Sequence, residues 1–222
     1  MNKRIIINFI GKIILIEVML MILPLLVSLI YGDGDTRGFL YTMIPAGIIG
    51  FALMKVKQKQ GRMSSRDGYF IVAAAWIIIS LIGAMPLYIN GGFPTYWNAL
   101  FEIVSGFTTT GASILVKPEE LGHGVLFWRS FTHWIGGMGV LVFVLMVMPM
   151  ENDNSMHLVR AEVPGNTAGK LVPRMRTTSM ILYGIYTTMT LLLIFLLVCF
   201  GMPLFDSFCL AFGTAGTGGF AV

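Results

Sequence analysis

Five long apolar segments alternate with polar connections along the chain. They cover about residues 5–31, 38–54, 69–90, 125–149 and 178–202. A helix needs about 20 mainly apolar residues to cross the hydrocarbon core of a bilayer. The first segment follows Lys3 and Arg4 as a signal peptide would, but it is too long and no small-residue cleavage site follows it. We therefore predict five membrane spans, the first of them permanent and kinked at Pro24.

Two further apolar segments are too short to cross a bilayer. Segments 95–116 and 203–222 each begin with about ten residues of helical character and continue as runs of Gly, Thr and Ala. Irregular backbone survives at membrane depth only where protein buries it or where it lines a water-filled cavity. The pattern therefore predicts two re-entrant segments, each a short helix followed by a small-residue loop.

The two short segments resemble each other and form an internal repeat. In our alignment Thr109-Thr110-Gly111 corresponds to Gly216-Thr217-Gly218, and Asn98 corresponds to Asp206. Thirteen steps separate Asn98 from Gly111, and 12 separate Asp206 from Gly218. The alignment therefore predicts that the first short helix is one residue longer than the second.

Composition excludes several classes of protein. The 222 residues are 56% hydrophobic and 12% charged, whereas a soluble domain carries about a quarter charged residues. A water-soluble enzyme and a disordered chain are excluded on these grounds. Two cysteines, Cys199 and Cys209, do not make a disulfide scaffold. The spans contain no nucleophile–base pair and no metal-ligand cluster, so we do not expect an enzyme.

The basic residues predict the orientation. Of the 15 Lys and Arg residues, three lie in 3–12, five in 55–66 and four in 160–176, all on one side of the predicted spans. The positive-inside rule places this side in the cytoplasm. We therefore expect a multi-pass protein of the plasma (cytoplasmic, inner) membrane with a cytoplasmic N-terminus. The net charge of +4 reflects this topology, and nucleic-acid binding is not needed to explain it.

The small-residue loops suit cation passage. Rings of backbone carbonyls can replace the hydration shell of a cation. Gly111 and Gly218 give the backbone the freedom to aim successive carbonyls at one axis, and the neighbouring threonines add small hydroxyl groups. Each short helix ends at its loop, so its negative dipole end can point toward the pathway.

Several ionisable residues lie within apolar segments. Glu102 and Asp206 are on the two short helices, where two roles stay open: enriching cations at an entrance, or anchoring the re-entrant loop through hydrogen bonds. We interpret Arg129 and His133 as membrane-interface anchors beside two tryptophans. For Glu17 we favour a hydrogen bond to a neighbouring helix over an ion site.

Two glycine-rich motifs have plain structural interpretations. Gly136, Gly137 and Gly139 favour close packing of helices over a hinge, because small residues let membrane helices approach each other. Gly32-Asp33-Gly34-Asp35 is interpreted as a polar turn between the first two spans.

Five motifs follow one another along the chain: SGFTTTGAS (105–113), WRSFTHWIGGMG (128–139), AEVPG (161–165), PRMRTT (173–178) and TAGTGGF (214–220). With these motifs the sequence resembles the potassium-uptake proteins of the Trk/Ktr/HKT superfamily, most closely the TrkH branch. Such proteins carry four linked repeats of outer helix, pore helix and inner helix around one pathway, and the TrkH branch adds an N-terminal helix pair.

The resemblance implies an all-α polytopic membrane protein with four parts. These are an N-terminal two-helix domain (1–66), a first pore repeat (67–150), a cytoplasmic connection (151–176) and a second pore repeat that lacks its inner helix (177–222). It also implies potassium transport by a pore-forming subunit, with K+ held by backbone carbonyls and no cofactor in this chain. The implied filter residues are Thr108, Thr109, Thr110, Gly111, Ala215, Gly216, Thr217 and Gly218.

Partners are also implied by the resemblance. They are a second full-length pore subunit, forming a homodimer, and a cytoplasmic nucleotide-binding regulatory subunit. Because this chain carries two of the four expected filter loops, we expect a truncated or partial copy of a transporter. The alternative is a non-conducting membrane subunit or an inactive truncation.

Overall fold

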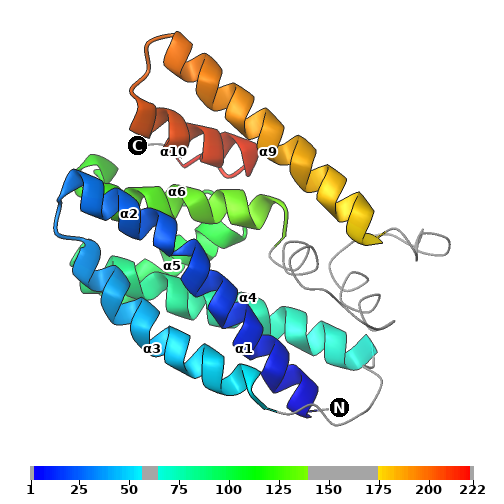
Figure 1. Cartoon of the computed structure of the whole chain (residues 1–222). Coiled ribbons are helices and arrows are strands. Elements are labelled where there is room, and N and C mark those ends of the chain that lie inside the picture. Colours follow the sequence, from blue (N-terminus) through cyan, green and yellow to red (C-terminus); the bar gives the residue numbers. More distant parts are fainter. Residues whose placement is uncertain (1–2, 57–64, 140–174, 221–222) are drawn as a thin grey trace.

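The computed structural model describes residues 3–56, 65–139 and 175–220, and within these residues it is all-α (Figure 1). Its helices are α1 (Lys3–Leu20), α2 (Ile22–Tyr31), α3 (Thr36–Met54), α4 (Ser65–Ile89), α5 (Tyr96–Phe107), the short 3-10 helix η1 (Pro118–Glu120), α6 (His123–Gly137), α9 (Met175–Cys199) and α10 (Leu204–Ala215). The predicted fold class is confirmed.

Four of the predicted spans are present as helices long and apolar enough to cross a membrane. They cover Lys3–Tyr31, Thr36–Met54, Arg66–Ile89 and Ser179–Cys199. The first is divided into α1 and α2 at Met21, next to the predicted kink at Pro24. Proline has no N–H to donate to the preceding turn, which accounts for an interruption here.

The predicted span over 125–149 is not one continuous helix. Helix α6 ends at Gly137, and Gly139 adopts a left-handed conformation with φ of 69°. Residues 140–149 lie outside the described part of the chain, as does the predicted cytoplasmic connection up to residue 174.

Helix α6 is the centre of the described structure. It packs against α2, α5 and α10, while α1 packs on α3 and α4, and α9 packs on α10 (Figure 1). Every residue of α6 from Gly124 to His133 is buried. A helix buried all round must be apolar or must satisfy its polar groups internally. Because α5 of the first repeat and α10 of the second repeat both pack on α6, the two predicted repeats meet at this helix.

Small residues allow these close approaches, as predicted for Gly136 and Gly137. A methyl group added to Gly136 would collide with the Phe107 carbonyl at the end of α5, and one added to Gly137 would lie 2.8 Å from the Gly216 Cα. Close packing at these two glycines is confirmed.

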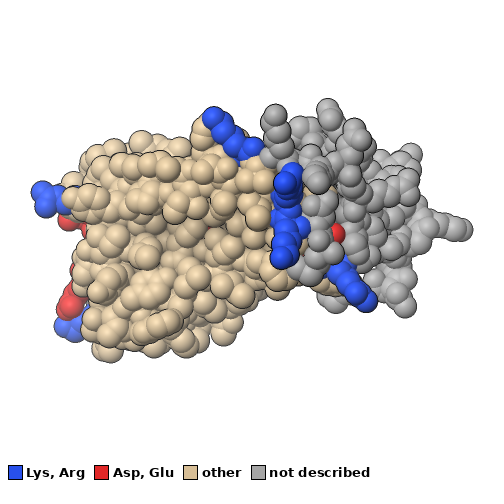
Figure 2. All heavy atoms as spheres, turned by 90° about the horizontal axis from the view of Figure 1, so that it is seen from below, with Lys and Arg blue, Asp and Glu red and all other residues tan. Residues whose placement is uncertain are grey.

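The outer surface is apolar over a broad band. Figure 2 shows Lys, Arg, Asp and Glu toward the two ends of the described part of the visible face, with uncharged atoms between them. Large apolar side chains such as Ile48 on α3 and Phe195 on α9 are more than 60% exposed. Together with the long apolar helices, this surface suits contact with lipid, so the chain is a multi-pass membrane protein.

Candidate functional site

Helix α5 ends in a hydrogen-bonded turn that begins the first small-residue loop. Its N-terminus is capped by the Thr95 side chain, which accepts from the Asn98 N–H at 3.3 Å. At its other end the Thr110 N–H donates to the Ser105 carbonyl and the Thr109 N–H to the Gly106 carbonyl. This pair of bonds is a Schellman motif, which needs a left-handed residue after the helix. Thr109 occupies that position with φ of 54°.

Helix α10 ends in the same way, 108 positions later in the chain. The Gly218 N–H donates to the Gly213 carbonyl, the Thr217 N–H donates to the Thr214 carbonyl, and Thr217 has φ of 59°. Gly111 and Gly219 follow with φ of 74° and 83°. The two loops therefore match in these bonds and φ angles, and the second loop adds a bond from the Gly219 N–H to the Gly213 carbonyl.

This equivalence corrects the sequence alignment of the repeats. Both short helices have 12 residues, so the prediction that the first is one residue longer is wrong. Gly111 corresponds to Gly219 and not to Gly218, because the hydrogen bonds and positive φ angles of both loops match at this constant spacing. We call residues 108–111 the first loop and residues 216–219 the second loop. Ala215, predicted as a filter residue, is the last residue of α10.

The two loops lie side by side. A methyl group built on Gly111 would overlap the carbonyl oxygen of Gly218, so only glycine fits at this contact. The loops follow the C-terminal ends of α5 and α10, where unpaired helix carbonyls carry partial negative charge. This arrangement brings the backbone of two repeats into contact beside the Gly218 carbonyl. A site for a bare cation needs backbone carbonyls gathered from several segments.

Glu102 anchors the chain that follows the first loop. Its carboxylate is fully buried and accepts from the Ser113 hydroxyl at 2.7 Å and the Ile114 N–H at 3.2 Å. It also accepts from Arg129 Nε on α6 at 2.6 Å. Of the two roles left open, anchoring is therefore the one present, and the buried carboxylate is not available at an entrance.

Asp206 has a different environment from Glu102. It is half-buried in the first turn of α10 and is equivalent to Asn98 in α5. A carboxylate there complements the positive end of the helix dipole. Its two predicted roles, enriching cations at an entrance and supporting the second short helix, both remain predictions.

Arg129 and His133 do not anchor the protein at a membrane interface, so this prediction is wrong. Arg129 is 2% exposed and His133 is fully buried, because both lie on the inner part of α6 against the two loops. The neighbouring Trp128 is fully buried as well and donates its indole N–H to the Gly83 carbonyl at 2.9 Å. Arg129 and His133 share one face of α6, but their spacing alone does not show whether that face meets protein or the membrane surface.

Glu17 also departs from its prediction. Its side chain is 3% exposed on α1 and lies toward Gly83 of α4, but neither carboxylate oxygen has a hydrogen-bond partner among the described residues. The expected bond to a neighbouring helix is therefore not present in the described part of the chain.

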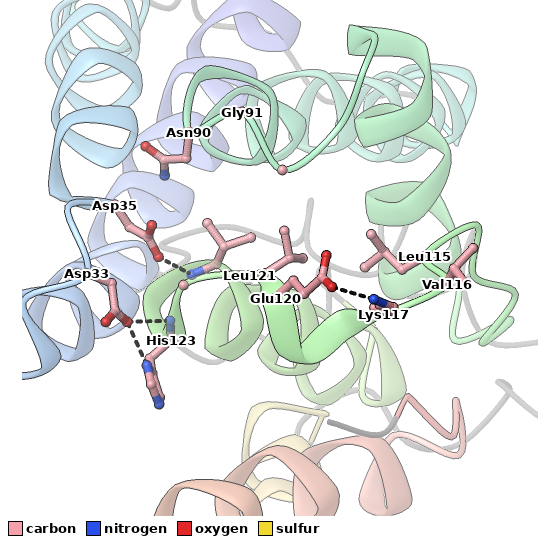
Figure 3. A pocket seen from close by; sticks show the side chains of 13 residues that line it. Asp33, Asp35, Asn90, Gly91, Leu115, Val116, Lys117, Glu120, Leu121 and His123 are labelled. Atoms are coloured by element: carbon pink, nitrogen blue, oxygen red, sulfur yellow. Dashed lines mark hydrogen bonds and ion pairs between the residues drawn. The ribbon is translucent and has the colours of Figure 1, made fainter.

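A pocket of about 880 Å³ opens at the end of the molecule where α2 joins α3 (Figure 3). The predicted polar turn is confirmed, with Gly32 and Gly34 both at positive φ. Its two aspartates reach the start of α6. Asp33 Oδ2 accepts from the His123 N–H at 2.8 Å and lies 2.6 Å from His123 Nδ1, and Asp35 Oδ2 accepts from the Val125 N–H at 3.3 Å. Sequence reasoning missed this contact, because 90 residues separate the partners.

The two aspartates of this turn have opposite electrostatic environments. The hydrogen bond from the His123 backbone lowers the pKa of Asp33, with further lowering by the His123 ring. Burial raises the pKa of Asp35, and the neighbouring Asp33 charge adds to the increase. Asp33 is thus the carboxylate that the fold holds in its charged form.

Comparison with known proteins agrees with this geometry. The chain is 37% identical to the Trk system potassium uptake protein TrkH of Escherichia coli strain K12 and 35% identical to TrkG of the same strain. These matches cover 100% and 99% of this chain and 46% of each relative. The chain therefore spans less than half the length of these curated relatives.

The fold is also similar to a solved structure. The crystal structure of the potassium transporter TrkH from Vibrio parahaemolyticus matches with a TM-score of 0.81 and 30% identity, over 100% of this chain and 44% of that one. The family described as TrkH, cation transport protein, matches residues 35–222. Since this match covers well over half of the sequence, the chain belongs to the TrkH family of cation transport proteins.

Proposed function

We propose that the full-length protein is a pore-forming subunit that carries K+ across the plasma membrane. The observation that carries the proposal is the meeting of two equivalent loops, with Gly111 against the Gly218 carbonyl. The relatives named potassium uptake proteins support K+ as the substrate. Entry would be driven by the membrane potential, which supplies about 2.3 kcal/mol per charge per 100 mV.

In this proposal the K+ ligands are backbone carbonyls of the first loop (108–111) and the second loop (216–219). The register of the second loop is one residue later than the sequence alignment suggested, because it follows the equivalence of Gly111 with Gly219. No cofactor is required, since the carbonyls and the membrane potential supply both the ligands and the driving force.

Two loops flank an ion on one side only, so further loops must complete its coordination. We propose that they belong to the full-length protein, because the chain spans 46% of the relatives it matches. The alternative, a non-conducting subunit or inactive truncation, predicts that residues 1–222 restore no K+ uptake in an import-deficient host, even beside a complementary half. Uptake by residues 1–222 together with a complementary half would support the proposal and contradict the alternative.

The partners and orientation are proposed from the resemblance to this family and the positive-inside rule. The N-terminus is cytoplasmic, the full-length subunits form a homodimer, and a nucleotide-binding subunit docks from the cytoplasm. Cysteine accessibility at Lys3→Cys and Arg37→Cys from either side of the membrane tests the orientation. Labelling of the first from outside would contradict it.

Gly111→Ser tests the assignment of the loops. A side chain at Gly111 would overlap the opposite carbonyl and strain a residue with φ of 74°, so we expect loss of K+ uptake or of K+ preference by the full-length protein. Gly201→Ser is the matched control, because Gly201 has φ of 92° but no neighbour within 4 Å. Uptake and preference unchanged in Gly111→Ser, at normal protein levels, would refute the assignment.

A further inference from the structure

Phe220, directly after the second loop, is seated on α6 of the first repeat. Its ring is 2% exposed, with its centroid 3.7 Å from Arg129 Cζ and 4.0 Å from the centroid of the His133 ring. Arg129 and His133 are four residues apart, so they lie on the same face of the helix. A guanidinium over an aromatic face is an attractive contact that strengthens when water is excluded.

Arg129 reaches the first loop at the same time. Its Nε donates to Glu102 at 2.6 Å, and its Nη2 donates to the Ser113 hydroxyl at 3.2 Å. Glu102 and Ser113 lie on either side of the first loop along the chain. One guanidinium therefore contacts the segments that carry both loops, although they are 108 positions apart.

His133 supports the second loop by shape. A methyl group built on Gly218 would overlap the His133 ring, and one built on Gly216 would overlap the His133 carbonyl. The two ring nitrogens have no hydrogen-bond partner among the described residues. The imidazole ring therefore packs against the second loop, and the Phe220 ring packs against the imidazole.

We propose that Glu102, Arg129, His133 and Phe220 form a loop anchor that sets the spacing between the first and second loops and so determines the preference for K+ over Na+. The inference rests on the proposed function. Because the proposed K+ ligands are backbone carbonyls, these four side chains are positioning residues. Preference among cations depends on where the carbonyl ligands are held, and the anchor joins the carbonyls of two repeats through α6.

Phe220→Leu is the first test, made in the full-length protein. Leucine keeps an apolar side chain but removes the ring that contacts Arg129 and His133. Because specificity is a difference between two affinities, we expect K+ preference over Na+ to fall by about threefold or more per folded molecule. The control is Phe208→Leu on α10, whose ring contacts Phe127 and Phe212 and leaves preference unchanged. Uptake of each ion is measured by competition and normalised to monodisperse protein.

A double-mutant cycle tests the link to the first loop. Glu102→Gln and Arg129→Lys each weaken the buried pair while conserving shape or charge. If the anchor acts as one unit, the double variant should lose no more K+ preference than the worse single variant. Losses that multiply independently would overturn the link between the loops.

The outcomes separate this inference from the proposed function. Normal preference in Phe220→Leu, in a protein whose wild type prefers K+, overturns the anchor and leaves the function intact. A variant that only lowers the amount of folded protein, with unchanged preference, also overturns it, because a purely structural role predicts that result. A wild-type protein without K+ uptake overturns both proposals.

Discussion

Thr109 and Thr217 occupy a position that usually belongs to glycine. Both follow a short helix and have φ of 54° and 59°, where a β-branched side chain is strained. The same unfavourable choice occurs at equivalent positions of two repeats. Strain of this kind persists where the surroundings determine the backbone, and such places are often functional sites. At the scale of the residue, the surrounding structure holds both loops in a backbone conformation that threonine disfavours.

Thr109→Gly should therefore stabilise the protein. Glycine removes the cost of about 1–2 kcal/mol that a left-handed conformation imposes on threonine. It also raises the entropy of the unfolded chain, which offsets part of this effect, so we expect a net stabilisation of up to about 1 kcal/mol. Thr110→Gly is the control: Thr110 has no positive φ and its hydroxyl bonds Thr108 at 2.8 Å, so this change should destabilise. We expect the melting temperature of the detergent-purified protein to rise in Thr109→Gly and to fall in Thr110→Gly. The opposite result would contradict the claim that Thr109 is strained.

Helix α6 receives its N-terminal cap from a distant turn. Its own N-cap residue, Gly122, has no side chain, and Asp33 and Asp35 of the α2–α3 turn accept the N–H groups of His123 and Val125. Negative charge at a helix N-terminus is favourable, and free N–H groups there need partners. At the scale of the element, the N-terminal helix pair is thus fastened to the central helix of the first repeat.

Asp33→Asn should weaken this attachment at neutral pH. The pKa of Asp33 is lower in the folded protein than in the unfolded chain, where it is about 4. The charged carboxylate therefore stabilises the fold at pH values above the unfolded pKa. This stabilisation is lost as pH falls through the folded pKa. We expect a loss of about 1 kcal/mol at pH 7 that shrinks under acid conditions. Asp35→Asn should cost less at pH 7, because the raised pKa of Asp35 makes its charge unfavourable. Melting curves across pH test both, and a pH-independent difference for Asp33→Asn would contradict the argument.

The molecule is assembled around glycine contacts on α6. Gly136 touches the end of α5, and Gly137 touches the second loop and the Tyr186 hydroxyl of α9. These contacts bring elements of both repeats onto one helix. At the scale of the molecule, the distance between the repeats is therefore fixed by backbone-to-backbone packing.

Gly136→Ala should separate α5 from α6. The added methyl group would collide with the rigid Phe107 carbonyl, and overpacking of this kind costs about 1–3 kcal/mol. Gly184→Ala on α9 has open space within 4 Å and should be neutral or stabilising, since alanine favours a helix. Thermal stability of the two variants checks this contrast, and equal effects would argue against the contact.

Sequence patterns predicted the features that depend on local chemistry. Apolar length gave four of the spans, and the glycines at 32 and 34 gave the turn. The register of the second loop was missed because Gly216, Gly218 and Gly219 offer several alignments that only backbone geometry separates. The placement of Arg129 was missed because its partners, Glu102 and Phe220, are far away in the sequence.

The central position of α6 has a consequence for biosynthesis. The face that carries Arg129 and His133 is covered by Phe220, which is synthesised after the whole of α9 and α10. Until then a charged and a polar side chain of α6 lack one of their covering surfaces, which is unfavourable in an apolar environment. Chains stalled within α9 would therefore carry a polar patch that Phe220 covers later.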